Sequence, residues 1–117
     1  MNSEEFINVI QLVVRDAAVE GTLENMMDPP GRKPAENLLA MSQWFKSLAD
    51  NDKIMLEKVM QEVANAAVFG FCAVLDGARS IENTPNKGDL ELYFVKDEER
   101  VRLNEPTNPL HDIFNAE

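Results

Sequence analysis

Apolar residues at the start of the chain recur every three or four positions, the spacing of one face of an α-helix. This first apolar stripe consists of Phe6, Ile10, Val13 and Ala17. Asn2 and Glu5 have the spacing of a capping box at a helix start, and Gly21 stands where a glycine commonly ends a helix. We therefore predict a helix over residues 3–20, followed by an irregular stretch over residues 22–33.

Two further helices are expected between Pro34 and Leu75. Pro34 suits the first position of a helix, and the stripe behind it consists of Leu38, Met41, Phe45 and Leu48. Asp50 and Asp52 then provide caps for a longer helix that ends near Leu75. The second half of this helix is apolar on every side except for Asn65, so we expect it to be enclosed at the centre of the fold or at a subunit interface.

The period of the pattern changes after Gly77 from helical to alternating. Leu90, Leu92 and Phe94 alternate with other residues at strand spacing, and Val101 and Leu103 do the same beyond a turn at residues 97–99. A short third strand is expected over residues 78–82. The tail carries Leu110, Ile113 and Phe114, spaced for one docked helical turn.

This order of elements predicts an α+β fold. It comprises three helices with a long central apolar helix, then a small antiparallel hairpin or meander, and a short C-terminal helical turn. A chain of 117 residues has the size of one domain. We expect a helical part over residues 3–76, a β-rich part over residues 78–104 and a docked tail over residues 105–117.

The charge balance limits the classes of partner. The chain has 21 acidic and 11 basic residues, for a formal net charge of -10. Such a field repels phosphate backbones and anionic membrane surfaces, so neither nucleic acid nor a membrane is expected as a partner. The start of the chain lacks the pattern of a secretory signal, the apolar run 63–75 is short for a membrane span, and Cys72 has no second cysteine. A cytoplasmic location is therefore expected.

No pattern typical of a catalytic, cofactor or metal site is present. His111 and Asp112 are adjacent in sequence, which directs their side chains apart, and Cys72 falls in the apolar run, where a thiol is unreactive. One histidine and one cysteine cannot form the usual zinc sites. We therefore predict no enzyme activity, no cofactor and no bound metal, although an all-carboxylate magnesium site stays open.

The favoured function is a cytoplasmic protein-interaction module that binds a basic protein, in the manner of an inhibitor or immunity protein. Electrostatic steering would speed the capture of such a partner. The candidate partner-binding residues are the exposed carboxylates near the strands and tail, Glu91, Asp97, Glu98, Glu99 and Glu105.

Two alternatives remain open. The first is a small-molecule-binding protein, or an enzyme without a recognisable motif, with a pocket between the central helix and the sheet. Its candidate lining is Trp44, Phe71 and Tyr93, with Arg79 or Arg102 to meet an anionic ligand. The second is a homodimeric accessory protein in which the long helix forms the interface.

Overall fold

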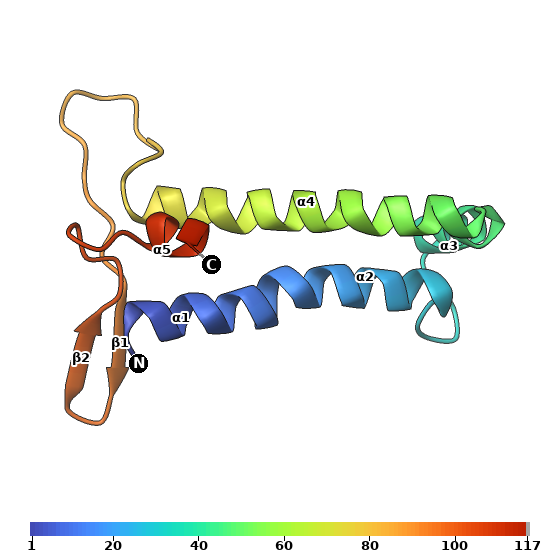
Figure 1. Cartoon of the computed structure of the whole chain (residues 1–117), viewed down its shortest axis with the longest axis horizontal. Coiled ribbons are helices and arrows are strands. Elements are labelled where there is room, and N and C mark those ends of the chain that lie inside the picture. The colour runs from blue at the N-terminus through green and yellow to red at the C-terminus, as the bar shows by residue number, and fades with distance from the viewer. Residues whose placement is uncertain (117) are drawn as a thin grey trace. The chain divides into compact units, whose positions relative to one another are not determined.

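The computed structural model describes residues 1–116 and has the expected α+β fold (Figure 1). The elements in chain order are α1 (Ser3–Ile10), the π-helix η1 (Gln11–Asp16), α2 (Ala17–Met27), α3 (Glu36–Ser47), α4 (Asp50–Leu75), β1 (Tyr93–Lys96), β2 (Glu99–Arg102) and α5 (Leu110–Ala116). The long central helix and the short C-terminal helix are both confirmed.

The chain divides into two compact units. Unit 1 contains Met1–Leu12 and Ala66–Glu117, and unit 2 contains Val13–Asn65. The boundaries fall inside η1 and inside α4, so two helical segments are shared between the units. Each unit is described separately, and a single domain stays a prediction.

The first helical segment is longer than the pattern predicted. It begins as expected, with the Asn2 side chain accepting a hydrogen bond from the Glu5 amide at 2.8 Å. It does not stop at Gly21, because α2 continues to Met27. A glycine inside a helix costs only about 1 kcal/mol. Tertiary contacts outweigh that cost, since Val19 and Met26 are buried on this helix.

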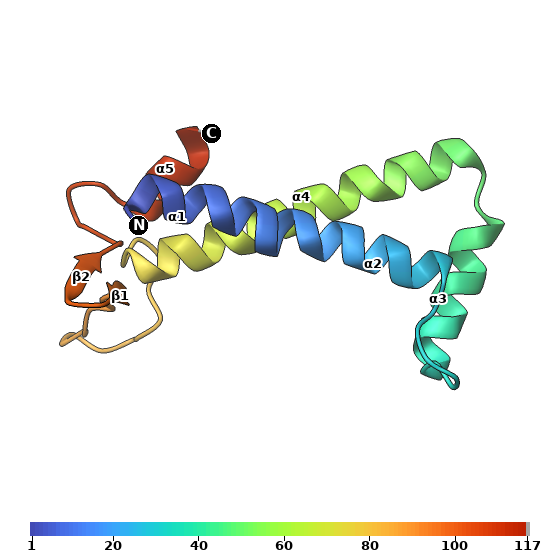
Figure 2. The same ribbon diagram turned by 90° about the horizontal axis from the view of Figure 1, so that it is seen from below.

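Unit 2 is built on the packing of α2 against α3. Ser42 of α3 donates a hydrogen bond to the Met26 carbonyl at 2.5 Å, which holds α3 to the end of α2. Phe45 is buried, and the Lys53 ammonium lies 5.4 Å from the centre of its ring. Figure 2 shows α3 passing into α4 through a short link, which contains Leu48. The helix start at Asp50 is as predicted.

Unit 1 has its core where α1, the end of α4 and α5 meet. The buried cluster consists of Ile7, Cys72, Leu110, Ile113 and Phe114. Ser3 at the start of α1 donates a hydrogen bond to the Leu103 carbonyl at 2.6 Å, linking the N-terminus to the segment that precedes α5. The predicted docking of the tail through Leu110, Ile113 and Phe114 is confirmed.

The strands form one antiparallel hairpin rather than a meander. Tyr93 pairs with Arg102 and Lys96 with Glu99, and the connecting turn contains Asp97 with a left-handed φ of 55°. The third strand expected over residues 78–82 is wrong. This segment is exposed and has no strand beside it, and the amides of Ala78 and Arg79 bind the Ala73 carbonyl at the end of α4 instead.

The expectation that the second half of α4 is enclosed at the centre of the fold is wrong, whereas the alternative of a subunit interface stays a prediction. Within α4 the buried residues are Gly70, Cys72 and Ala73. Phe71, in contrast, is exposed over 65% of its surface. The physical reason is that each unit covers one side of α4, whereas its apolar residues continue around the helix.

Candidate interaction surface and ligand pocket

An apolar stripe runs along α4 in unit 2. Met55, Val59 and Val63 are four residues apart, so they lie on one face of the helix, and all three are exposed. Leu56 and Met60, on the neighbouring face, are half-buried. Exposed apolar residues that line up in this way are typical of a surface that binds another molecule. We call Met55, Val59 and Val63 the apolar stripe.

The charges beside the apolar stripe are mainly negative. Helical spacing places Asp52 one turn before Met55 and Glu62 one turn after Val59. Lys58, one turn after Met55, adds one positive charge. Lys53 is half-buried with its ammonium near the ring of Phe45.

A second feature of unit 2 is an acidic groove of about 430 Å³ between α2 and α4. Its lining consists of Arg15, Asp16, Val19, Glu20, Glu57, Gln61, Glu62 and Asn65. Arg15 forms an ion pair with Asp16 at 3.0 Å and a hydrogen bond with Asn65 at 3.3 Å, so its charge is already engaged. The groove is lined by Glu57, Gln61 and Asn65, whose helical spacing sets them apart from the apolar stripe.

The π-helix contributes two residues to this groove. Arg15 and Asp16 both belong to η1 and both line the groove. π-Helical turns are rare and are found frequently at functional sites. The combination marks the groove as a second candidate surface.

Helix α4 is also long and apolar enough to span a membrane by length and composition, which for one helix is weak evidence. Core helices commonly pass the same test, but only 17% of the most apolar window of α4 is buried. Most of this window of α4 is therefore exposed among the residues that the structure describes.

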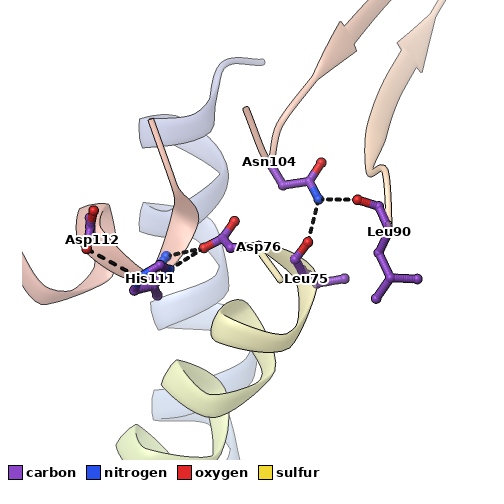
Figure 3. A network of polar contacts seen from close by, with 6 residues as sticks. All are labelled: Leu75, Asp76, Leu90, Asn104, His111 and Asp112. Atoms are coloured by element: carbon purple, nitrogen blue, oxygen red, sulfur yellow. Dashed lines mark hydrogen bonds and ion pairs between the residues drawn. The ribbon is translucent and has the colours of Figure 1, made fainter. Parts of the chain in front are cut away.

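In unit 1, a network of polar contacts surrounds the end of α4 (Figure 3). Asp76 Oδ2 accepts a hydrogen bond from the His111 amide at 2.8 Å and lies 2.6 Å from His111 Nδ1. The amide nitrogen of Asn104 donates to the carbonyls of Leu75 and Leu90, and its oxygen accepts from the Leu92 amide. These contacts fix the hairpin and α5 to the end of α4.

One atom of this network has no partner in residues 1–116. Asp76 Oδ1 is buried without a hydrogen bond, and the side chain of Asp76 is 3% exposed. Figure 3 shows this oxygen on the side of the carboxylate away from His111. A buried acceptor without a donor is costly, and in native proteins its explanations include strain, a bound water or ion, and a catalytic role.

Asp76 lines a pocket of about 540 Å³ in unit 1. The walls are the end of α4, the loop that follows it, Arg102 of β2, and the segment between β2 and α5. The charged lining residues are Asp76, Arg79, Glu82, Lys87, Asp89, Glu91, Arg102 and Glu105. The Arg79 guanidinium lies against Gly70 of α4, so closely that a methyl group at position 70 would collide with it.

The five carboxylates predicted to bind a partner are all exposed in unit 1. Asp97 and Glu98 lie in the hairpin turn and Glu99 begins β2, whereas Glu91 and Glu105 line the pocket. Glu91 accepts a hydrogen bond from the Tyr93 hydroxyl at 2.7 Å, and this contact raises the pKa of Tyr93. The five do not form one continuous site.

The structure brings together two of the five predicted ligand-binding residues. Arg79 and Arg102 line the pocket, whereas Tyr93 and Phe71 are not part of its lining. Trp44 belongs to unit 2 and is exposed.

Sequence reasoning missed Asp76 and Asn104. Asp76 stood only as the residue before a helix-ending glycine, and Asn104 as the residue after a strand. A signal for Asp76 was present, because a charged residue directly after a long apolar run often continues into the core. The pairing of Asp76 with His111, 35 residues apart, could not be read from spacing.

Cys72 is buried as predicted, with 2% of its surface exposed. Burial, together with the nearby Asp76 carboxylate, raises the pKa of its thiol to about 11. Within residues 1–116, no group of three His, Cys, Asp or Glu side chains is arranged to hold a metal ion. In comparisons with known proteins, no family model, curated protein or solved structure matches the chain.

Proposed function

We propose that this chain is a protein-interaction module whose apolar stripe is covered by a basic segment of another protein. The supporting observation is the exposure of Met55, Val59 and Val63 over successive turns of α4. Burial of apolar surface supplies about 25 cal/mol per Å² removed from water, so an exposed row of this kind favours association.

The charge of the partner follows from the charges of this chain. Asp52 and Glu62 flank the apolar stripe, and the whole chain carries a formal charge of -10. A partner with lysine or arginine beside its apolar residues pairs with these carboxylates and approaches faster. A second copy of the chain brings the same negative charge and is therefore disfavoured.

A protein is favoured over a lipid bilayer as the cover. One side of α4 carries the polar residues Glu57, Gln61 and Asn65, and Lys58 and Glu62 add charges. Charged groups in a bilayer centre are costly, and an acidic chain is repelled by anionic lipids.

The test uses two synthetic helical peptides of about 18 residues, long enough to form a helix on binding. Both carry the same leucine face, and their polar faces consist of lysines in one peptide and glutamates in the other. We expect the lysine peptide to bind the full chain, with Val63→Asp weakening its affinity at least tenfold, by about 1.4 kcal/mol or more. Titration calorimetry measures both affinities.

Val95→Asp is the matched control. Val95 lies on the hairpin in unit 1 and has the same exposed fraction as Val63, 64%. We expect this variant to bind the lysine peptide as the unmodified chain does. The proposal fails if the glutamate peptide binds equally well, if both valine variants behave alike, or if the chain binds neutral lipid vesicles and neither peptide.

A further inference from the structure

The pocket of unit 1 is lined by two side chains of opposite charge, Asp76 and Arg79. Asp76 Oδ1 is a buried carboxylate oxygen without a donor in residues 1–116. Arg79 is exposed, its backbone amide donates to the Ala73 carbonyl at 3.1 Å, and among residues 1–116 no ion pair or hydrogen bond engages its guanidinium. Neither group is used by the proposed interaction surface, which lies in unit 2.

The fold holds the pocket in place around these two groups. At one end of the loop, Gly77 has a left-handed φ of +79° and ends α4. At the other end, the Asn104 amide nitrogen donates to the Leu90 carbonyl at 2.8 Å. Between them, the Glu82 carboxylate accepts from the Gly88 amide at 3.1 Å. Contacts within the loop therefore shape one wall, and the end of α4 forms another.

The Oδ1 atom of Asp76 suits a ligand that donates a hydrogen bond. His111 engages only Oδ2, through its amide and its ring. The remaining oxygen bears part of a negative charge away from water, where a charge-assisted hydrogen bond is at its strongest. An ammonium group provides such a donor together with the opposite charge.

The guanidinium of Arg79 suits an anionic group on the ligand. Its guanidinium packs on the backbone at Gly70, where the absence of a side chain allows the close approach. A guanidinium held in this way presents several donors in a fixed plane, which suits a carboxylate. Arg102 lines the same pocket, with its Nε 3.3 Å from the Asn104 oxygen.

We infer that this pocket binds a small zwitterion of the α-amino acid class. Its ammonium group pairs with Asp76 Oδ1 and its carboxylate with the Arg79 guanidinium. The volume of about 540 Å³ lies within the usual range of small-molecule sites. The pairing supplies a partner to both the Asp76 oxygen and the Arg79 guanidinium, which a simple anion or a simple amine does not.

In the experiment, the full chain is titrated with each of the standard L-α-amino acids. Binding is measured by calorimetry or NMR. We expect at least one of them to bind with a dissociation constant below about 1 mM. For that amino acid, the analogue without the carboxylate and the analogue without the amine are each expected to bind at least tenfold more weakly. These analogues test both contacts without altering the fold.

Arg79→Gln provides the protein side of the test, because this exposed guanidinium forms no hydrogen bond within residues 1–116. We expect it to weaken amino acid binding at least tenfold. Lys96→Gln, which removes a positive charge on β1 outside the pocket, is expected to leave binding unchanged. The inference is overturned if no amino acid binds, if either analogue binds as tightly as its parent, or if Arg79→Gln has no effect. Because the probes are small molecules at unit 1, none of these results bears on the peptide-binding proposal for unit 2.

Discussion

Asp76 is the residue on which most of the polar contacts at the end of α4 depend. It binds the amide and the ring of His111, and so ties α5 to the helix. Its side chain is nearly fully buried, and buried carboxylates are tolerated only when hydrogen bonds compensate for the loss of water. Substitution of a residue that binds Asp76 should therefore lower the free energy of unfolding.

His111→Ala is expected to lower the free energy of unfolding by about 1–3 kcal/mol, because Asp76 would keep only the backbone hydrogen bond. The substitution also removes the edge-to-face contact between His111 and Phe69, whose ring centres are 6.1 Å apart. Asp112→Ala is the control. Asp112 is 68% exposed and 3.4 Å from His111 Nε2, so its loss should change stability by no more than about 0.5 kcal/mol. Urea unfolding compares the two, and equal effects would show that the Asp76 contact contributes little.

Cys72 should stay a protonated, unreactive thiol at neutral pH. Its pKa is raised to about 11 by burial and by the Asp76 carboxylate. Between the ordinary thiol pKa and about 11, the unfolded chain loses a proton that the folded chain retains. This contribution to stability is therefore complete below the ordinary thiol pKa and is lost as the pH rises towards 11.

The measurement is the rate of labelling of Cys72 by a thiol reagent. At pH 8 we expect slow labelling of the folded chain and rapid labelling in urea, because the thiolate is the reactive form. Fast labelling of the folded chain at pH 8 would contradict the burial of Cys72.

At the scale of elements, tertiary contacts overrode two local signals. Gly21 is a helix-stopping residue by its type, yet the helix passes through it to Met27. A strand was predicted over residues 78–82, yet they remain irregular because no neighbouring strand pairs with them. Where a strong cap or a long apolar pattern was present, as at Asp50 and along α4, the predicted element formed.

Gly21, inside α2, and Gly77, just after α4, should respond in opposite directions to alanine. Gly21→Ala is expected to stabilise the chain by about 0.5–1 kcal/mol, since a glycine is costly inside a helix and no atom lies within 4 Å of an added methyl group. Gly77→Ala is expected to destabilise it by about 1–2 kcal/mol, because its φ of +79° is unfavourable for alanine. The measurement is the midpoint of urea unfolding of each variant. A shift of both midpoints in the same direction would contradict the assigned helix end at Gly77.

At the scale of the whole molecule, charge and exposed apolar surface act in opposite ways on association. The formal charge of -10 opposes contact between two copies, while the exposed side chains on α4 favour it. Salt weakens charge effects and leaves apolar burial largely in place. The response to salt therefore distinguishes a basic partner from a second copy.

We expect binding of the lysine peptide to weaken as salt is raised from about 0.05 M to about 0.5 M, because attraction between opposite charges is screened. The chain alone is expected to sediment as a monomer at low salt, with any self-association increasing as salt is added. Sedimentation velocity at several concentrations makes this measurement. A stable dimer at low salt would favour the homodimeric alternative instead.

The sequence by itself determined the elements whose signals are local. The helix start at Asp50, the end of α4 near Leu75, the docked C-terminal turn and the α+β order all follow from caps, apolar period and turn residues, which act over a few positions. The burial of Cys72 followed in the same way. Of the candidate ligand-binding residues, the sequence named Arg79 or Arg102 to meet an anionic ligand, and both line the pocket of unit 1.

Only the tertiary structure decided which faces of α4 are covered and which polar groups meet. The sequence alone does not distinguish a buried apolar residue, such as Cys72, from an exposed one, such as Val63. The difference depends on which distant segments pack beside each residue. The contact of Asp76 with His111 and the free oxygen that it leaves likewise arise from chain segments 35 residues apart. Such contacts depend on the packing of whole elements, which no local pattern encodes.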